Sequence, residues 1–544
     1  MRRSDAVLYN VGLREIPPSR RSLQASDVFV GFLCLYLLTI GRTPPLGDAI
    51  PMWETAESLV RHGSLAIATR WPINAPLGRG GHYYPVAALL ACLIHVPGAM
   101  LQVIFSAAAP ARAAQLSVLT SQLGPAVLGA ATPALLFRLL LQAGYSRRQA
   151  AWTALLLGLG TSVWVYAHRP YSEAVQTFCF VLFLGTLLRA ADTPTRGGFL
   201  RLGLAVGLLI NSKNVYFACL PGALIFLWLR LRGRPRDLRG GLIWAAVGLL
   251  PGVAALAAYN FVRWGSIANS GYGAVTEGAW RESVFFGLWG QLLSPGRSLF
   301  LFSPPLIFGL FGIRRLVKNR PAVAQAIALT VFPLVLVYAH YLFWSGDWGW
   351  GPRYLVFALP ALIIPVAELI EPTPTAGRRW RRLGLGGALV AGLAVQILGM
   401  AFYWDDFIAI SRRVQYEWLG HPDLRGSLMA PYPCFSCFDE LYSVQWLPST
   451  QPIEGHAWLL RHKLAHDDWQ TAQRDAPWAR YTSLSLNIRE PYDYAAIDWW
   501  LLFAPRGRRF ALVALSGLFF LTLIPLRLWA ATLSGPPAVE PRAE

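Results

Sequence analysis

The 544-residue chain is 55% hydrophobic but only 14% charged, whereas a soluble globular protein carries about 25% charged residues. Apolar runs long enough to cross a bilayer recur along it, so the composition excludes an ordinary soluble domain and indicates a polytopic membrane protein. The net charge of +19 does not indicate a nucleic-acid partner. The basic residues form short clusters between apolar runs, as the cytoplasmic loops of membrane proteins do.

The first apolar run, at about residues 27–40, is interpreted as a retained signal anchor whose N-terminus lies inside the cell. Outer loop one (about 43–115) follows. It opens with an acidic stretch, residues 47–63, whose apolar positions have helical spacing. Asp48 stands at the start of this helix. A solvated helix with Asp48 at its positive end would explain the pattern without any function.

The predicted topology depends on residues 83–105, which are apolar enough to be counted as a span. If they crossed the membrane, every later basic cluster would lie outside, against the positive-inside rule. We therefore predict a re-entrant or juxtamembrane helix at the outer surface. The basic clusters behind this choice are Arg147/Arg148, Arg230/Arg232/Arg234/Arg236/Arg239, Arg314/Arg315/Lys318/Arg320 and Arg378/Arg379/Arg381/Arg382.

With that choice, the chain is predicted to be an all-α polytopic membrane protein with about twelve transmembrane helices. Residues 1–402 form the main transmembrane module, in which outer loop four covers about 259–298. A small irregular outer domain (403–509) is rich in Trp, Tyr, Pro and His. It precedes the last transmembrane helix (510–530) and a disordered, Pro-rich tail (531–544).

The unusual polar residues fall on the outer side of this topology, among them Asp48, Glu173, Arg297 and Arg353. Charges near the centres of the predicted spans are scarce, although a transporter or proton pump usually needs them. The pattern therefore favours a function at the outer face of the membrane in which the chain lies. The alternatives are a transporter or flippase for lipid-linked saccharides and a non-catalytic assembly partner.

The outer location restricts the chemistry. No nucleotide-sugar or ATP pool exists outside, so a group-transfer enzyme needs a donor that is already activated and delivered through the lipid. A polyprenyl-phosphate sugar fits, because its phosphate is a good leaving group and requires no general acid. The enzyme then needs one carboxylate for the acceptor's proton, cations for the phosphate and an apolar groove for the prenyl chain.

Several segments of the chain resemble those of a known enzyme family. The spacing Asp48…Met52…Glu54…Ala56…Gly63 is similar to the Asp-Glu-x-x-Tyr-Ala-Glu-x-Ala…Gly stretch of GT-C-type glycosyltransferases, which include the protein mannosyltransferase and aminoarabinose transferase groups. Over about residues 27–370, further segments resemble bacterial family-39-like members in the same order. These segments are Pro170-Tyr171-Ser172-Glu173, Tyr259-Asn260-Phe261-Val262-Arg263-Trp264-Gly265-Ser266, Ser294-Pro295-Gly296-Arg297 and Trp350-Gly351-Pro352-Arg353-Tyr354.

The resemblance implies a GT-C-like fold with periplasmic juxtamembrane helices, a catalytic base at Asp48 and a second acid at Glu173. Arg297 and Arg353 would hold the donor phosphate. The remaining implied site residues are the phosphate-binding Arg79 and His82 and the supporting Glu54, Tyr84 and Tyr354.

Three positions depart from the family pattern. Ala49 follows Asp48 where the family has an acid, and Met52 replaces the usual aromatic residue. The basic residue that often precedes the juxtamembrane helix has no clear match, so Arg79 or His82 would substitute for it.

Three of the implied site residues have simpler alternatives here. Arg353 could be an interfacial arginine beside Trp348 and Trp350, and Arg297 has a similar alternative. Glu173 could be an acid that stabilises a helix N-terminus after Pro170.

The sequence Cys434-Phe-Ser-Cys437 is the one cysteine pair in polar surroundings. A zinc half-site and a redox pair are alternatives, but a structural disulfide is favoured in an oxidising outer compartment.

The sequence thus predicts an integral-membrane glycosyltransferase that moves a sugar from a polyprenyl-phosphate donor to a lipid, glycan or protein acceptor. The expected location is the bacterial inner membrane, with both termini cytoplasmic, the active site periplasmic and membrane lipid around the spans. No cofactor follows from the sequence, and a divalent metal stays open.

Overall fold

The computed structural model describes most of the chain as helices joined by short connections. The described residues are 22–41, 45, 47–68, 75–108, 110, 113–346, 348–370, 378–404, 407–408, 410–411, 442–477, 516–517, 521–523 and 526–533. Cys434, Cys437 and most of the last predicted span lie outside these ranges.

The helices follow one another closely along the chain. In the first half they are α1 (Ala25–Leu38), α2 (Ala49–His62), η1 (Arg79–Gly81), α3 (Leu89–Leu93), α4 (Val96–Ala108), α5 (Ala113–Ser121), α6 (Leu123–Gln142), α7 (Arg147–Gly160), α8 (Val163–Tyr166), α9 (Glu173–Asp192), α10 (Arg196–Ser212), η3 (Asn214–Cys219), α11 (Leu220–Leu231) and α12 (Pro235–Trp264). In the second half they are α13 (Tyr272–Thr276), α14 (Val284–Leu293), α15 (Leu299–Phe302), α16 (Pro305–Asn319), α17 (Pro321–His340), η4 (Arg353–Ala358), α18 (Leu359–Leu362), α19 (Ile364–Ala367), α20 (Arg378–Ala401), α23 (Tyr442–Trp446), η6 (Pro448–Thr450), α24 (Pro452–Ala465) and α25 (Trp469–Arg474).

The predicted all-α, polytopic class is confirmed. Seven helices in the described part of the chain are long and apolar enough to cross a membrane, by length and composition. Pairing of the β type is limited, over the same residues, to three isolated bridges, and two of them join Tyr83 to Ile67 and to Leu77. The count of twelve spans stays a prediction.

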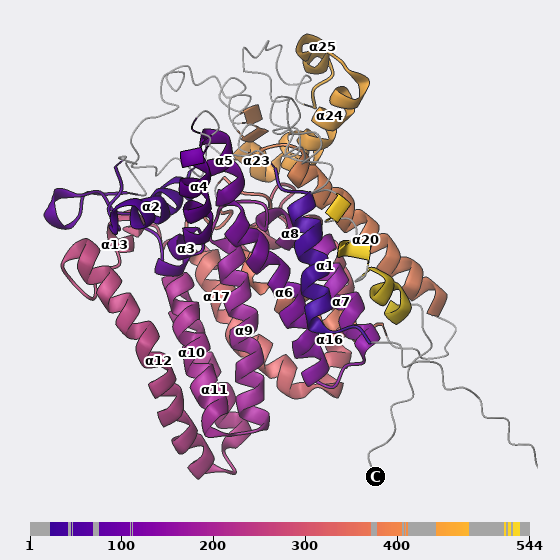
Figure 1. Ribbon diagram of the computed structural model, residues 1–544. Coiled ribbons are helices and arrows are strands. Elements are labelled where there is room, and N and C mark those ends of the chain that lie inside the picture. The colour runs from indigo at the N-terminus through magenta and orange to yellow at the C-terminus, as the bar shows by residue number, and fades with distance from the viewer. Residues whose placement is uncertain are drawn as a thin grey trace, which may run out of the picture.

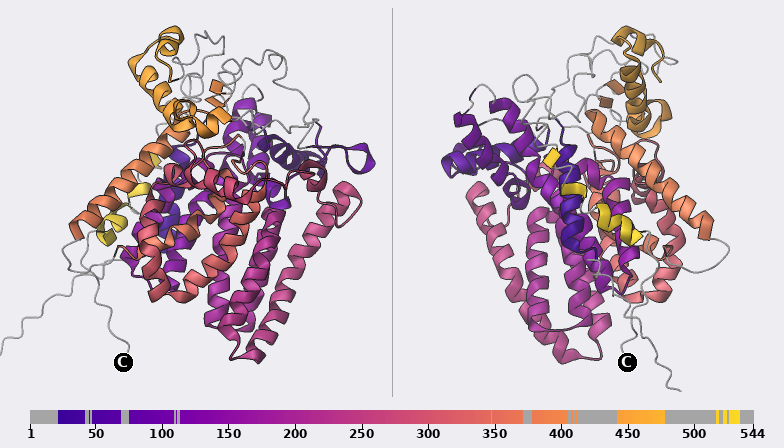
Figure 2. Two further views of the ribbon diagram at one scale, coloured as in Figure 1. Left: turned by 180° about the vertical axis from the view of Figure 1, so that it is seen from behind. Right: turned by 45° about the vertical axis from the view of Figure 1, so that its right-hand side comes forward.

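The stretch on which the predicted topology depends consists of two helices, α3 and α4, separated at Ile94–His95. Leu89–Ala108 counts among the seven apolar stretches by length and composition. In Figures 1 and 2, however, α2, α3, α4 and α5 lie together at the upper end of the bundle, not alongside α6 and α9. His95 fixes this group: its Nδ1 lies 2.9 Å from the Ser121 carbonyl oxygen, and its ring meets Trp53 edge-on. This arrangement agrees with a juxtamembrane location, which stays a prediction.

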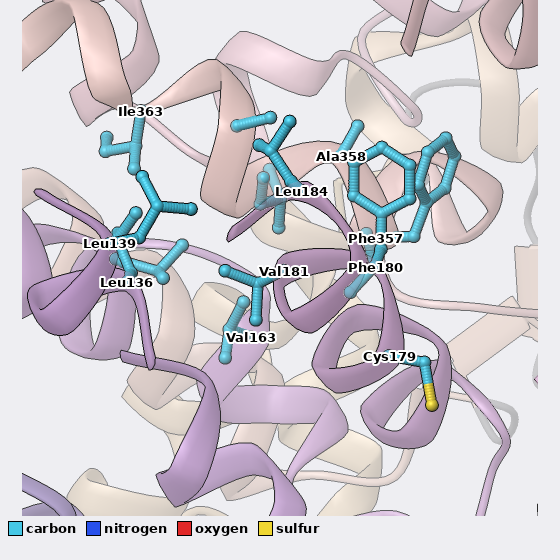
Figure 3. Close-up of a cluster of buried hydrophobic side chains, with 14 of the residues drawn as sticks. Leu136, Leu139, Val163, Cys179, Phe180, Val181, Leu184, Phe357, Ala358 and Ile363 are labelled. Carbon is cyan, nitrogen blue, oxygen red and sulfur yellow. The ribbon is translucent and has the colours of Figure 1, made fainter. Parts of the chain in front are cut away.

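The hydrophobic core aligns the two elements that carry the candidate site. Figure 3 shows apolar side chains of α6, α8, α9 and the η4–α18 region in one buried cluster. Within it, the rings of Phe180 on α9 and Phe357 on η4 are 4.9 Å apart and nearly perpendicular, a favourable geometry for an aromatic pair. Because α9 begins at Glu173 and η4 at Arg353, this packing sets the two first residues beside each other.

At the other end of the bundle, Glu368 connects three chain segments. It accepts hydrogen bonds from the Tyr145 hydroxyl and from Arg320 Nη1, both at 2.8 Å, and from Asn319 Nδ2 at 3.0 Å. The Arg320 guanidinium also lies 3.6 Å from the centre of the Tyr145 ring. Burial, and then the hydrogen bond to Glu368 and its charge, raise the pKa of Tyr145, so its hydroxyl stays a donor.

We expect Glu368→Ala to lower the free energy of unfolding by about 2–4 kcal/mol, because it removes one member of a buried ion pair and leaves the Tyr145 and Asn319 donors unpaired. The matched control is Asp192→Ala. Asp192 pairs with Arg230 at 3.9 Å, but the two side chains are 56% and 39% exposed, and such a pair contributes about 0–1 kcal/mol. Thermal unfolding in detergent measures both, and equal shifts would contradict the expected role of Glu368.

Candidate active site

Three residues from distant parts of the chain meet at the upper end of the bundle. Arg353 donates from Nε to Glu173 Oε1 at 2.6 Å and from Nη2 to Asp48 Oδ2 at 2.7 Å. Asp48 directly precedes α2, Glu173 is the first residue of α9, and Arg353 is the first residue of η4. One guanidinium therefore joins the two carboxylates that the sequence singled out.

The two carboxylates differ in exposure. The Asp48 side chain is 46% exposed, whereas the Glu173 side chain is 3% exposed and that of Arg353 is 7% exposed. Glu173 Oε2 is buried and has no hydrogen-bond partner within the described residues. Asp48 is thus the carboxylate that an outside molecule can reach, and Glu173 holds Arg353 from within.

Asp48 occupies the N-cap position of α2, but its side chain makes no capping hydrogen bond. The carboxylate instead points to Arg353. Simple helix capping therefore does not explain this residue. Its position before α2 still places it at the positive end of the helix dipole.

Arg353 is held on two sides. Its guanidinium carbon lies 4.7 Å from the centre of the Tyr171 ring, within the range of a cation–π contact. Two of the five N–H donors of an arginine are used by the carboxylates. A side chain so buried and paired is not the interfacial arginine that the sequence left as an alternative.

The loop before Arg353 has a shape that requires glycine. Gly346 and Gly351 have φ values of +79° and +69°, a region that other residues rarely adopt. A Cβ on Gly346 would lie 2.7 Å from Arg353 Cβ, and one on Gly351 would lie 2.6 Å from the Phe302 ring. Gly346 and Gly351 thus let the loop fold tightly around Arg353.

Arg297 holds the same loop through a hydrogen bond to its backbone. It is completely buried, and its Nη1 donates a hydrogen bond to the Gly349 carbonyl oxygen. The Ser298 hydroxyl, next along the chain, accepts hydrogen bonds from the N–H groups of Phe300 and Leu301 and so caps α15. The phosphate role implied for Arg297 stays a prediction.

The other residues implied by the resemblance have different described surroundings. Arg79 packs over the Phe261 ring at 4.8 Å, His82 is exposed, and no described contact links either to Arg353. Tyr84 is buried against Trp264. Glu54 is half-buried on α2.

Tyr354 belongs to an aromatic group beside the site. Its ring stacks on Tyr338 at 4.8 Å with the planes 10° apart, and Lys213 Nζ lies 4.6 Å from the centre of the Tyr354 ring.

No metal-binding group of three or more His, Cys, Asp or Glu residues occurs within the described residues.

Two tyrosines near the carboxylates were not assigned a role from the sequence. Tyr171 stood inside the Pro-Tyr-Ser-Glu segment, two residues before Glu173, so its position was a usable signal. Tyr272, on α13, is coupled to Asp48: burial and then the negative charge of Asp48 raise the pKa of its hydroxyl. That hydroxyl is therefore a proton-bearing group near the exposed carboxylate at neutral pH.

No known protein-family model and no curated protein match the chain. Solved structures do. ArnT from Cupriavidus metallidurans, bound to undecaprenyl phosphate, is 15% identical with a TM-score of 0.46, and the match covers 94% of this chain and 76% of ArnT. The Archaeoglobus fulgidus oligosaccharyltransferase in its apo form is 13% identical with a TM-score of 0.45, over 79% of this chain and 60% of that one. Both are GT-C glycosyltransferases, the group that the sequence resembles.

We expect Arg353→Ala to destabilise the protein by about 3 kcal/mol or more, because Glu173 would keep a buried charge without a partner. Adding Glu173→Gln in the same chain should recover part of the loss, since it removes that charge. Thermal unfolding of the two single variants and the double variant measures the coupling. Arg61→Ala, which breaks the exposed pair with Glu57 on α2, is the control, and a strictly additive double variant would contradict the expected coupling.

Proposed function

We propose that this chain is an integral-membrane glycosyltransferase that moves a sugar from a polyprenyl-phosphate donor to an acceptor hydroxyl or amine at the periplasmic face of the bacterial inner membrane. The observation that carries the proposal is the Asp48–Arg353–Glu173 cluster, in which one carboxylate is half exposed and the other is buried. Its position at one end of a bundle of apolar helices suits a lipid-borne donor and a water-borne or lipid-borne acceptor.

Asp48 is the base in this proposal. Its carboxylate takes the proton as the acceptor oxygen or nitrogen forms a bond to the anomeric carbon of the sugar. The bond from that carbon to the phosphate oxygen breaks, and its electron pair leaves with the polyprenyl phosphate. Because the acceptor attacks opposite the leaving phosphate, the anomeric configuration inverts. Such a step requires a base within hydrogen-bond reach of the proton that it takes. The ion pair with Arg353 limits the directions in which Asp48 can point.

Arg353 orients Asp48 and supplies positive charge. Its remaining N–H donors would stabilise the developing charge of the leaving phosphate. Glu173 acts from the buried side, because its ion pair fixes the direction of the guanidinium. Arg79 and His82 would meet a phosphate only if the donor extended over the η1 region, where both residues lie.

We expect Asp48→Asn to reduce transfer by about 10²–10⁴-fold, the usual range for loss of a general base. Asparagine keeps the shape and can still accept the hydrogen bond from Arg353, so folding should be little changed. The assay follows a radiolabelled sugar from a polyprenyl-phosphate donor into a new glycosidic product, with purified protein in lipid vesicles.

The control is Glu57→Gln, a change of an acid on the same helix that pairs with Arg61 on the surface. It should leave transfer unchanged. Normal turnover by Asp48→Asn would exclude Asp48 as the base. Movement of the labelled donor across the vesicle membrane without any new glycosidic bond would instead indicate a transporter or flippase.

A further inference from the structure

The Arg297 turn (294–298) and the Arg353 loop (344–353) both rest on the chain that follows α20. We name this part, Phe402–Trp404 together with α23 and α24, the outer brace. We propose that it is a positioning element that fixes the two arginine-bearing segments relative to each other. Apart from Phe402, the brace belongs to the region 403–509, for which the sequence suggested only an irregular domain. Its effect on turnover rests on the proposed function, whereas its effect on the two segments does not.

The Arg297 turn is locked to α23 through backbone atoms. The Gly296 N–H donates to the Gln445 carbonyl oxygen at 3.1 Å. A Cβ on Gly296 would lie 1.7 Å from the Val444 carbonyl oxygen, so any larger residue would drive the turn and α23 apart. Trp446 continues the contact, with its ring 5.9 Å from that of Trp344 at the start of the Arg353 loop.

The Arg353 loop is held by α24. His456 is fully buried, and its ring lies 4.8 Å from that of Trp350, which is itself fully buried. His456 Nδ1 lies 2.7 Å from the Leu398 carbonyl oxygen, which fixes the ring on α20. Burial lowers the pKa of His456 to about 4, so the ring is neutral at physiological pH and packs as an aromatic spacer.

Trp404 closes the contact behind Arg353. Its ring is stacked on Tyr171, the same ring that lies under the Arg353 guanidinium, and its Nε1 donates to the Trp348 carbonyl oxygen at 3.3 Å. The guanidinium carbon of Arg169 also lies 4.7 Å from the centre of the Trp404 ring.

These contacts connect the brace to both arginines. Arg297 donates to the Gly349 carbonyl oxygen, so a displaced Arg297 turn also loosens the Arg353 loop. Arg353 in turn aims the Asp48 carboxylate. A shift in the brace should therefore reach the exposed carboxylate without any residue of the brace touching a substrate.

The first test compares Gly296→Ala with Gly273→Ala. Gly273 lies in the same outer loop, and a Cβ there would meet nothing within 4 Å. We expect Gly296→Ala to make amide hydrogen exchange roughly tenfold faster in peptides covering 294–302 and 344–353, with no change around Glu368. Gly273→Ala should match the unchanged protein. Identical exchange in all three would overturn the proposal.

The second test separates the two contacts of His456. His456→Phe keeps the ring against Trp350 but loses the hydrogen bond to Leu398, whereas His456→Asn can keep the hydrogen bond and loses the ring. We expect exchange in peptides covering 344–353 to stay near normal in His456→Phe and to rise roughly tenfold in His456→Asn. The reverse order would overturn the assigned role of the ring.

Transfer activity of the same variants gives the catalytic consequence. We expect the turnover number to fall roughly tenfold in Gly296→Ala and His456→Asn and to stay near that of the unchanged protein in His456→Phe. Binding of undecaprenyl phosphate should stay measurable in all three variants. Faster exchange without any loss of turnover would overturn the link from the brace to Asp48. If the unchanged protein transfers no sugar at all, the proposed function fails, and the exchange data still decide whether the brace holds the two segments.

Discussion

The placement of one guanidinium between two carboxylates is the interaction on which the candidate site depends. Arg353 joins Asp48 and Glu173, which are 305 and 180 residues away from it in the chain. Glu173 is buried and Asp48 is half exposed. The buried ion pair therefore fixes the guanidinium, and the guanidinium fixes the direction of the exposed carboxylate. A carboxylate on a free loop would sample many directions, whereas this one has a fixed partner and therefore a narrow range of orientations.

The rest of the fold explains why the three groups meet. Phe180 and Phe357 pack in the core below them, so the starts of α9 and η4 cannot slide past each other without opening a cavity. The Glu368 contacts hold the opposite end. Between these fixed points the Gly346 and Gly351 conformations allow the loop to turn tightly enough to bring Arg353 inward. Stability and site geometry therefore depend on the same few contacts.

Much of this arrangement could be predicted from the sequence, because it rests on local patterns. Apolar run length predicted the helices, charge asymmetry favoured a common side for Asp48, Glu173 and Arg353, and short motifs marked each residue separately. Their direct pairing could not be predicted, since it arises from the packing of segments hundreds of residues apart. For the same reason, the outer region gave no sequence signal of its contacts: His456 and Trp404 pack against Trp350 and Tyr171, which lie in other segments. The phosphate role that the resemblance implies for Arg79 stays a prediction, and the contact of its side chain with Phe261 could not be predicted from the sequence either.

The shared arginine has a consequence for the order of events in the proposed reaction. While both carboxylates are ionised, the guanidinium faces two negative charges and the three groups together carry a net charge of about −1, which would repel an anion at the exposed side. Uptake of a proton by Asp48 removes one of these charges and leaves Arg353 balanced against Glu173 alone. The repulsion thus disappears at the step in which the phosphate gains negative charge. In this way the arginine shared by two ion pairs would link proton transfer to departure of the leaving group.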